Sequence, residues 1–293
     1  MRRFLNREFY QNYTRKNRYD SRTVWKKKVK MTLEHVGLDF KQNKCLFHAL
    51  DDVNLKVYDR DFICLLGPSG CGKSSLLNVM AGYRKPGEGK VLLGGEAFLK
   101  PSAKVGVVFQ HANLFPWLSV YKNVEFGLKQ KNMDRNQRKD QVEHYLEIVG
   151  LTEAKDKLPH QLSGGMQQRA AIARTLATEP EFVLLDEPFS ALDALSREKM
   201  QEHIRKIWEE TGSTFLFITH DVDEALLLGK RLVVMQGNPG RIVSDYKNPL
   251  NKYENIDYEQ LRQTKEYWKI RQKLIGQIQN DEEKKAEKLI QFG

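Results

Sequence analysis

The sequence predicts an α/β fold in which a mostly parallel sheet is covered on both faces, and three observations support this class. Predominantly apolar runs of strand length recur along the chain, at residues 62–66, 104–109, 181–186 and 214–219. Such runs are typical of strands buried on both faces of a parallel sheet. Helical patterns lie between these runs, and a glycine-rich loop directly follows the first of them.

The helices between the strands are predicted from the spacing of apolar residues. In residues 142–149 these fall at positions i, i+3, i+4 and i+7, and Gly150 follows as a helix C-cap. The apolar residues in 200–208 fall at the related helical spacing i, i+4, i+7 and i+8, and Gly212 lies just beyond them. We therefore expect a mostly helical segment, about residues 112–165, to be inserted between two strands of the sheet.

The chain divides into three regions. Residues 1–30 form a basic N-terminal extension that we expect to be disordered, residues 31–245 form one large domain, and residues 246–293 form a polar, helical C-terminal region. The alternation typical of a strand begins at Met31, which makes Met31 a plausible true start of the protein.

The C-terminal region has one apolar stripe on a polar helix. Ile270, Leu274 and Ile278 recur at every fourth position and so lie on one face. The charged residues 281–288 that follow are most simply a solvated end.

The net charge of +10 is concentrated in one tail. Residues 1–30 contain eleven Lys and Arg against two acidic residues, a balance of +9, so the rest of the chain carries only +1. This tail could contact anionic lipid or nucleic acid. A solvated arm or a start at Met31 is the simpler interpretation, and nucleic acid is not expected as a partner.

The composition also bears on the compartment. No run of 18 apolar residues is present, so no segment is expected to span a bilayer. The three cysteines lack metal-ligand spacing, which indicates a reducing cytoplasm without a disulfide framework.

A phosphate-binding loop is predicted between the first buried strand and the helix after it. The stretch "GPSGCGKS" matches the G-x-x-x-x-G-K-[ST] pattern, with a strand before it and a helix after it. Its backbone N–H groups would surround phosphate oxygens, Lys73 would contact the β- and γ-phosphates, and the Ser74 hydroxyl would bind Mg²⁺. The predicted nucleotide-binding residues of this loop are Gly67, Pro68, Ser69, Gly70, Cys71, Gly72, Lys73, Ser74 and Ser75.

An acidic pair after another strand completes the expected triphosphate site. The stretch "FVLLDEP" places Asp186 and Glu187 at the carboxyl end of a buried strand, where α/β sheets bind ligands. Asp186 would hold the Mg²⁺ shell, and Glu187 would act as the general base for water. No guanine-reading N-K-x-D motif is found, so ATP is the expected nucleotide.

The stretch "LSGGMQQRAAIARTLA" at 162–177 resembles the signature motif of ATP-binding cassette (ABC) proteins, with Met166 where the family usually has Gln. The resemblance implies a P-loop NTPase core of the RecA-like kind, with an inserted α-helical subdomain and a small antiparallel β part. It also implies that Ser163, Gly164 and Gly165 contact the γ-phosphate bound by a second copy, so that two ATP molecules lie between two chains.

Other residues match family elements in the expected order. Gln110 corresponds to the glutamine that contacts Mg²⁺ and water, Asp193 to an aspartate at the dimer interface, and His220 to the histidine that contacts the γ-phosphate and attacking water. The aromatic residue that stacks on adenine is either Phe40 or Phe47, and Phe40 is preferred.

The turn "LFPW" matches the surface that contacts the permease in ABC transporters. Phe115, Pro116 and Trp117 would contact a coupling helix of the membrane subunit, although Trp117 could instead pack in the core of the insertion. The stretches at 123–129, 189–198 and 235–242 further resemble the subfamily that imports taurine, other sulfonates, nitrate and thiamine precursors.

The resemblance therefore implies an ATP-hydrolysing subunit of a bacterial importer, most similar to those for taurine. Its partners would be a second copy, two permease subunits and, indirectly, a solute-binding protein, at the cytoplasmic face of the inner membrane. Alternatives are the same role for nitrate or a thiamine precursor, a soluble ABC ATPase acting on nucleic acid, an exporter ATPase, or an inactive binding module.

Overall fold

The computed structural model describes residues 28–42, 45–131, 133–253 and 258–291. Within these residues the strands form two sheets. The larger sheet has the order β10–β9–β3–β8–β7–β6 and consists of β3 (Phe62–Leu66), β6 (Val105–Val108), β7 (Phe182–Asp186), β8 (Thr214–Thr219), β9 (Arg231–Gln236) and β10 (Arg241–Lys247). All its neighbouring strands are parallel except the edge pair β9–β10.

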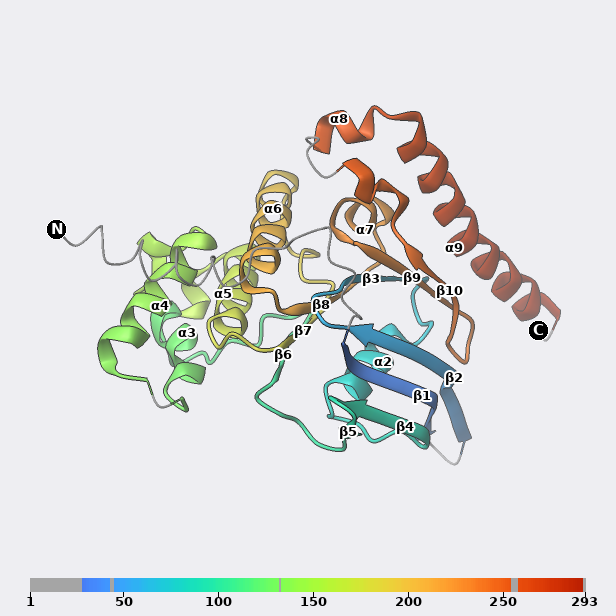
Figure 1. The fold of residues 1–293 in the computed structure, drawn as a ribbon, viewed down its shortest axis with the longest axis horizontal. Helices are drawn as coiled ribbons and strands as arrows, with labels where there is room; N and C mark the ends of the chain where they lie inside the picture. Colours follow the sequence, from blue (N-terminus) through green and yellow to red (C-terminus); the bar gives the residue numbers. More distant parts are fainter. Residues whose placement is uncertain (1–27, 43–44, 132, 254–257, 292–293) are drawn as a thin grey trace.

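The smaller sheet is antiparallel and packs on the side of the larger one (Figure 1). It has the order β2–β1–β4–β5 and consists of β1 (Val29–Gln42), β2 (Cys45–Tyr58), β4 (Glu88–Leu93) and β5 (Glu96–Ala97). The predicted α/β class with a small antiparallel part is therefore confirmed.

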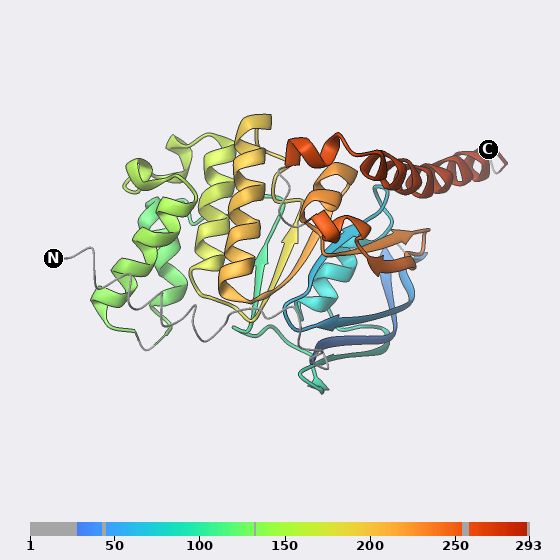
Figure 2. The ribbon, with the colours of Figure 1, turned by 45° about the horizontal axis from the view of Figure 1, so that its top comes forward.

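Helices lie on both sides of the larger sheet, with α3, α4 and α5 together at one end of the molecule (Figures 1 and 2). The α-helices are α2 (Lys73–Met80), α3 (Val120–Leu128), α4 (Arg135–Ile148), α5 (Gly164–Leu176), α6 (Ala194–Thr211), α7 (Val222–Leu228), α8 (Tyr258–Arg262) and α9 (Lys265–Gln291). Short 3₁₀ helices occur at η1 (Thr152–Ala154), η2 (Pro159–Gln161) and η3 (Pro249–Tyr253).

The side chains of strand β3 pack into two hydrophobic clusters, one on each face of the larger sheet. Phe62, Cys64 and Leu66 pack into the cluster formed with α3 to α7 and α9, whereas Ile63 and Leu65 pack against α2 and the antiparallel sheet. All five side chains are fully buried. Because successive side chains of a strand point to opposite faces, a sheet covered on both sides requires apolar residues at every position.

The element boundaries differ slightly from the expected regions. Strand β1 begins at Val29 rather than Met31, because it continues its pairing with β2 as far as Tyr58. Residues 1–27 of the predicted extension lie outside the described residues. At the other boundary, β10 runs past residue 245 to Lys247, and α9 then packs Ile270 and Leu274 against the helical core.

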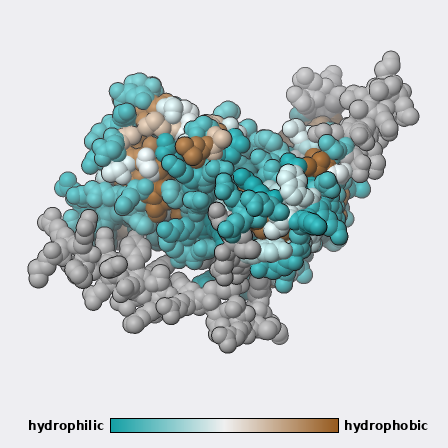
Figure 3. Space-filling model, turned by 90° about the horizontal axis from the view of Figure 1, so that it is seen from above, coloured by the Kyte–Doolittle hydropathy of each residue, from teal (hydrophilic) through white to brown (hydrophobic). Residues whose placement is uncertain are grey.

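The described helices were also assessed for membrane insertion. In the ranges given above, no helix is both long and apolar enough to cross a bilayer. The face seen from above in Figure 3 is mainly hydrophilic, with small, separate hydrophobic patches.

Candidate nucleotide site

The predicted phosphate, metal and catalytic residues follow strands that end at one edge of the larger sheet. In register, Leu66 of β3 pairs with Thr219 of β8, and Asp186 of β7 pairs with Ile218 of β8. Strand β6 ends alongside, because Val108 pairs with Leu185. The loops that follow these parallel strands therefore lie at the same carboxyl edge, which is where open α/β sheets bind ligands.

The glycine-rich loop can adopt its conformation only because it lacks certain side chains. A Cβ atom at Gly67 would come within 2.3 Å of the carbonyl oxygen of Met235. Gly72, at the N-cap of α2, has a φ of 93°, in the left-handed region that favours glycine. Both glycines let the backbone turn sharply into the N-terminus of α2, where free N–H groups can bind an anion.

Lys73 lies inside this loop. Its side chain is buried, and Nζ donates hydrogen bonds of 2.8 Å to the carbonyl oxygens of Gly67 and Pro68. These contacts hold the ammonium group at the centre of the loop, so the positive charge is already placed for a phosphate. Cys71, also in the loop, is buried and packs in the apolar cluster formed with α2 and the antiparallel sheet.

Ser74 and Asp186 are brought together from different elements, as predicted. The two side chains form a hydrogen bond, and this bond together with Lys73 partly offsets the burial that raises the pKa of Asp186. A hydroxyl and a carboxylate are hard oxygen donors, and a small number of protein ligands suits Mg²⁺, which keeps several waters and binds substrate phosphates. The donor set therefore fits Mg²⁺.

Glu187 and His220 form a contact across the sheet edge. Nδ1 of His220 lies 3.1 Å from Oε2 of Glu187. The backbone of Glu187 has a φ of 44°, which is unusual for a residue with a side chain, and its N–H donates to the carbonyl of Ile218 at 3.0 Å. Strained positions of this kind cost about 1–3 kcal/mol and are concentrated at functional sites.

Gln110 lies in the exposed loop after β6, and its anchor was not anticipated from the sequence. Gln168 of α5 is buried and donates from Nε2 to the carbonyl of Phe109 at 2.8 Å. This bond links α5, the helix that begins in the signature motif, to the residue before Gln110. The only sequence signal for this anchor was a glutamine on an apolar face of the helix. Its partner could not be predicted, because it lies 59 residues away in the chain.

The signature residues begin a helix that packs on the other face of the larger sheet from α2. Ser163 is the N-cap of α5, and its Oγ accepts from the N–H of Met166 at 3.3 Å. Ser163 and Gly164 are exposed. Helix α5 packs in the helical core, whereas α2 packs on the opposite face of the sheet, so the structure does not bring this cap to the chain's own loop.

Asp193 is also exposed at a helix N-terminus. It caps α6, with Oδ1 accepting from the N–H of Ser196 at 2.9 Å, and the backbone hydrogen bond from Ser196 lowers the pKa of Asp193. Exposed Leu195 lies beside it. The cap fixes the direction of this loop at the surface.

The turn "LFPW" is held from inside by Asn123, a residue that sequence analysis did not single out. Asn123 is fully buried, accepts from the N–H of Phe115 at 2.9 Å, and donates to the carbonyls of Phe115, Leu118 and Ser119. These bonds satisfy the side chain and, together with the bond that the N–H of Leu118 donates to the carbonyl of Phe115 at 3.1 Å, fix the turn.

Trp117 projects from this turn instead of packing in the core. It is 73% exposed, so the alternative of a core role is wrong. Phe115 is half-buried, with its ring centroid 4.5 Å from that of Phe126 and 5.8 Å from that of Trp117. Three aromatic rings and Pro116 thus form an exposed apolar surface, which we call the aromatic turn (Phe115, Pro116, Trp117 and Phe126).

Both candidates for adenine stacking lie side by side. Phe40 of β1 and Phe47 of β2 are paired directly across the two strands, so their side chains share one face. Phe47 is 45% exposed, whereas Phe40 is partly buried under the Arg84 guanidinium, 5.4 Å from the ring centroid. Phe40 packs against the apolar cluster that also contains Cys71 of the phosphate loop.

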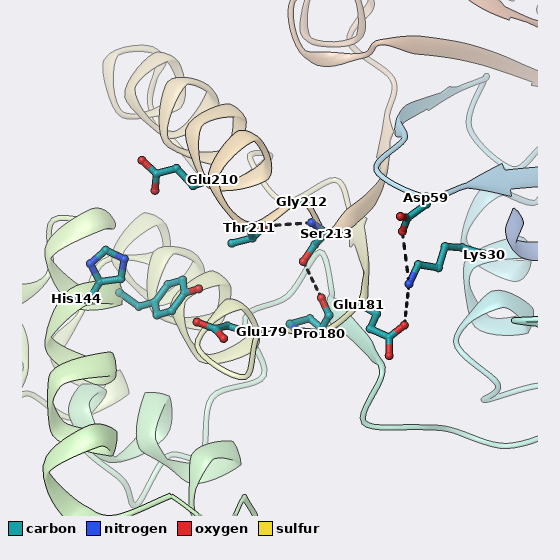
Figure 4. Close-up of a pocket in the computed structure, with 11 residues that line it drawn as sticks. Lys30, Asp59, His144, Glu179, Pro180, Glu181, Glu210, Thr211, Gly212 and Ser213 are labelled. Atoms are coloured by element: carbon teal, nitrogen blue, oxygen red, sulfur yellow. Dashed lines mark hydrogen bonds and ion pairs between the residues drawn. The ribbon is translucent and has the colours of Figure 1, made fainter. Parts of the chain in front are cut away.

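A separate cavity of about 450 Å³ lies at the opposite edge of the sheet (Figure 4). Its lining includes Glu181 and Ser213, which directly precede β7 and β8, and Lys30, which forms ion pairs with Glu181 and Asp59. Because it is at the amino ends of the strands, this cavity is not part of the triphosphate site.

The fold and the residues at its carboxyl edge define a P-loop nucleoside triphosphatase. A family model described as "ABC transporter" matches residues 50–190. An uncharacterized ABC transporter ATP-binding protein of Methanocaldococcus jannaschii is 45% identical over 254 residues, covering 87% of this chain and 93% of the relative. The chain belongs to the ABC transporter family, as the signature motif indicated, and its general activity is ATP hydrolysis.

Two further comparisons agree with this assignment. A taurine import ATP-binding protein of Jannaschia sp. is 45% identical over 236 residues, covering 80% of this chain and 88% of the relative. A dimeric, post-hydrolysis ATP-binding cassette solved with ADP and phosphate is 34% identical with a TM-score of 0.68, covering 74% of this chain and 98% of that structure. The predicted P-loop fold is therefore confirmed.

Proposed function

We propose that this protein is the ATP-hydrolysing, energy-coupling subunit of an importer for a small sulfonate, with taurine as the first candidate. The observation that carries the ATPase role is the meeting of Lys73, Asp186, Glu187 and His220 at one sheet edge. Similarity to several taurine import ATP-binding proteins supports the choice of cargo.

ATP would bind at the phosphate loop of one chain. Its phosphates would accept hydrogen bonds from the loop N–H groups and from Lys73, which would exchange its bonds to the Gly67 and Pro68 carbonyls for phosphate oxygens. Phe40 would stack on the adenine. Ser74, Asp186 and Gln110 would hold Mg²⁺, which would neutralise charge on the phosphate oxygens when bound.

Hydrolysis would depend on Glu187 and His220. The Glu187 carboxylate would accept the proton of the attacking water, and His220 would orient that water and the γ-phosphate. Their 3.1 Å contact supports this assignment because it holds the two groups together at the carboxyl edge of the sheet.

A second copy would complete each site. Ser163, Gly164 and Gly165 form an exposed helix N-terminus that does not reach the chain's own loop, and such a terminus favours anions. In a head-to-tail dimer it would meet the γ-phosphate on the partner chain, and Asp193 would lie at the interface.

The aromatic turn would couple this dimer to the membrane. Arg174 donates to the carbonyls of Ala112 and Asn113, and its guanidinium lies 5.6 Å from the Phe115 ring centroid. The signature helix α5, which carries Arg174, is thereby linked to the turn. Two permease subunits would contact this surface, placing the protein peripherally at the cytoplasmic face of the inner membrane; a solute-binding protein would deliver the cargo.

Trp117→Ala is expected to uncouple transport from ATP binding. Truncation of an exposed aromatic anchor at the centre of an interface costs about 2 kcal/mol or more, which weakens docking on the permease about 30-fold. Nucleotide affinity should be unchanged, because the ring does not contact the phosphate loop. The measurement is cargo uptake by proteoliposomes, and the control is Leu99→Ala, which truncates another exposed apolar side chain. Normal uptake by the Trp117 variant would exclude this docking surface.

The cargo is tested by growth of a strain lacking this gene on different sulfur and nitrogen sources. We expect failure on taurine as sole sulfur source, rescued by the wild-type gene and not by a Glu187→Gln variant. A defect limited to nitrate or to a thiamine precursor would retain the importer and replace its cargo. Normal growth on all of these sources would contradict the proposed transport role.

A further inference from the structure

The helix that follows His220 is held by a chain of polar contacts. Asp221 caps α7, with Oδ1 accepting from the N–H groups of Asp223 at 2.8 Å and Glu224 at 3.2 Å. Thr219, on the other side of His220, donates from Oγ1 to the Glu224 carboxylate at 2.6 Å and accepts from the N–H of Asp221 at 3.0 Å. The position of His220 is therefore set by the first turn of α7.

The C-terminal helix α9 forms hydrogen bonds to this same turn of α7. Asp223 Oδ1 accepts from the Tyr267 hydroxyl at 2.6 Å and from Nε of Arg271 at 2.7 Å, and Nη2 of Arg271 lies 3.4 Å from Oδ2. Tyr267 is 2% exposed and Leu274 is fully buried, so the part of α9 that forms these bonds is packed against the core. Bonds to a charged carboxylate are stronger and more directional than neutral ones.

The C-terminal region also contacts α6, the helix that Asp193 caps. Arg262 at the end of α8 lies 3.5 Å from Glu198 of α6, and Arg197 of α6 lies 3.9 Å from Glu224 of α7. A cavity of about 340 Å³ is lined by residues of α6, α7 and α9 in this region. Helix α7 is therefore held both by α6, through Arg197, and by α9, through the bonds to Asp223.

We propose that Tyr267 and Arg271 are positioning residues for ATP hydrolysis, which act on His220 through Asp223 and the first turn of α7. This inference rests on the proposed role of His220. The C-terminal helix would then support catalysis, although it lies far along the chain from His220.

The first test is Arg271→Ala in the full-length chain. With the guanidinium removed, Asp223 keeps only the Tyr267 hydroxyl as a donor from α9, and the first turn of α7 can shift. A displacement of about 1 Å can cost up to about 100-fold in rate; because part of the support remains, we expect kcat to fall about tenfold. KM for ATP should be unchanged because the phosphate loop is not altered. Arg271→Lys should recover only part of the rate, since an ammonium group cannot reproduce the fork of two donors.

Two further variants separate positioning from loss of folding. Tyr267→Phe removes one oxygen from a buried ring and should also lower kcat while thermal unfolding still shows a folded protein. Lys269→Ala removes an exposed charge from the same helix and should match the wild type. A fall in kcat for Lys269→Ala equal to that for Arg271→Ala would overturn the specific role of the Asp223 contacts.

A double-mutant cycle with His220→Ala identifies the path of the effect. If α9 acts through His220, adding Arg271→Ala to His220→Ala should lower kcat no further. Multiplicative losses would overturn the inference while leaving the role of His220 intact. If His220→Ala alone hydrolyses ATP at the wild-type rate, the proposed role of His220 fails, and the inference fails with it.

Discussion

Glu187→Gln is expected to lower the rate of ATP hydrolysis by about 10²–10⁴-fold, the range that a positioned general base contributes. The amide keeps the size of the side chain but cannot accept a proton from water. Because the phosphate loop is unchanged, ATP binding should persist, and the dimer that ATP holds together should accumulate. Turnover by the purified protein and its mass by light scattering at millimolar ATP measure the two effects.

The matched control for this variant is Glu210→Gln, which makes the same chemical change at an exposed position of α6. It should hydrolyse ATP at the wild-type rate and should not accumulate as a dimer at millimolar ATP. A Glu187→Gln protein that binds ATP but stays monomeric would argue against the sandwich of two nucleotides. One that hydrolyses ATP normally would argue against Glu187 as the base.

Lys73→Ala is expected to weaken ATP binding strongly. Nζ of Lys73 is held at 2.8 Å from two loop carbonyls, at the point where the β- and γ-phosphates would lie. A hydrogen bond to a charged group contributes about 1.5–3 kcal/mol, so the loss of this ammonium group should weaken ATP affinity about 10–150-fold. Isothermal titration with Mg²⁺ and ATP gives the dissociation constant directly.

Lys85→Ala is the control for Lys73→Ala, because Lys85 is an exposed lysine that makes no predicted phosphate contact. Its affinity should equal that of the wild type. Circular dichroism of the Lys73 variant should show an intact fold. If a folded Lys73→Ala protein retains wild-type affinity, the phosphate loop is not the nucleotide site.

Local sequence determined those parts of the site in which the chemistry lies within a short stretch of chain. The loop from Gly67 to Ser74 could be predicted because its glycines, lysine and serine must have fixed spacing to surround a phosphate. Asp186 and Glu187 could be placed because parallel strands end at a common edge. The period of the apolar residues likewise determined the α/β class, since strands and helices bury side chains at different intervals.

The contacts that hold these residues in place were decided by the tertiary structure, because they join segments far apart in the chain. Gln168 anchors the residue before Gln110, Asn123 holds the turn that exposes Trp117, and Arg271 reaches Asp223 from the C-terminal helix. A polar side chain gives a short-range sequence signal only if its partner lies at a fixed spacing. For these residues the partner is set by how helices pack on the sheet, and so the exposure of Trp117 and the support behind His220 became visible only once the chain was folded.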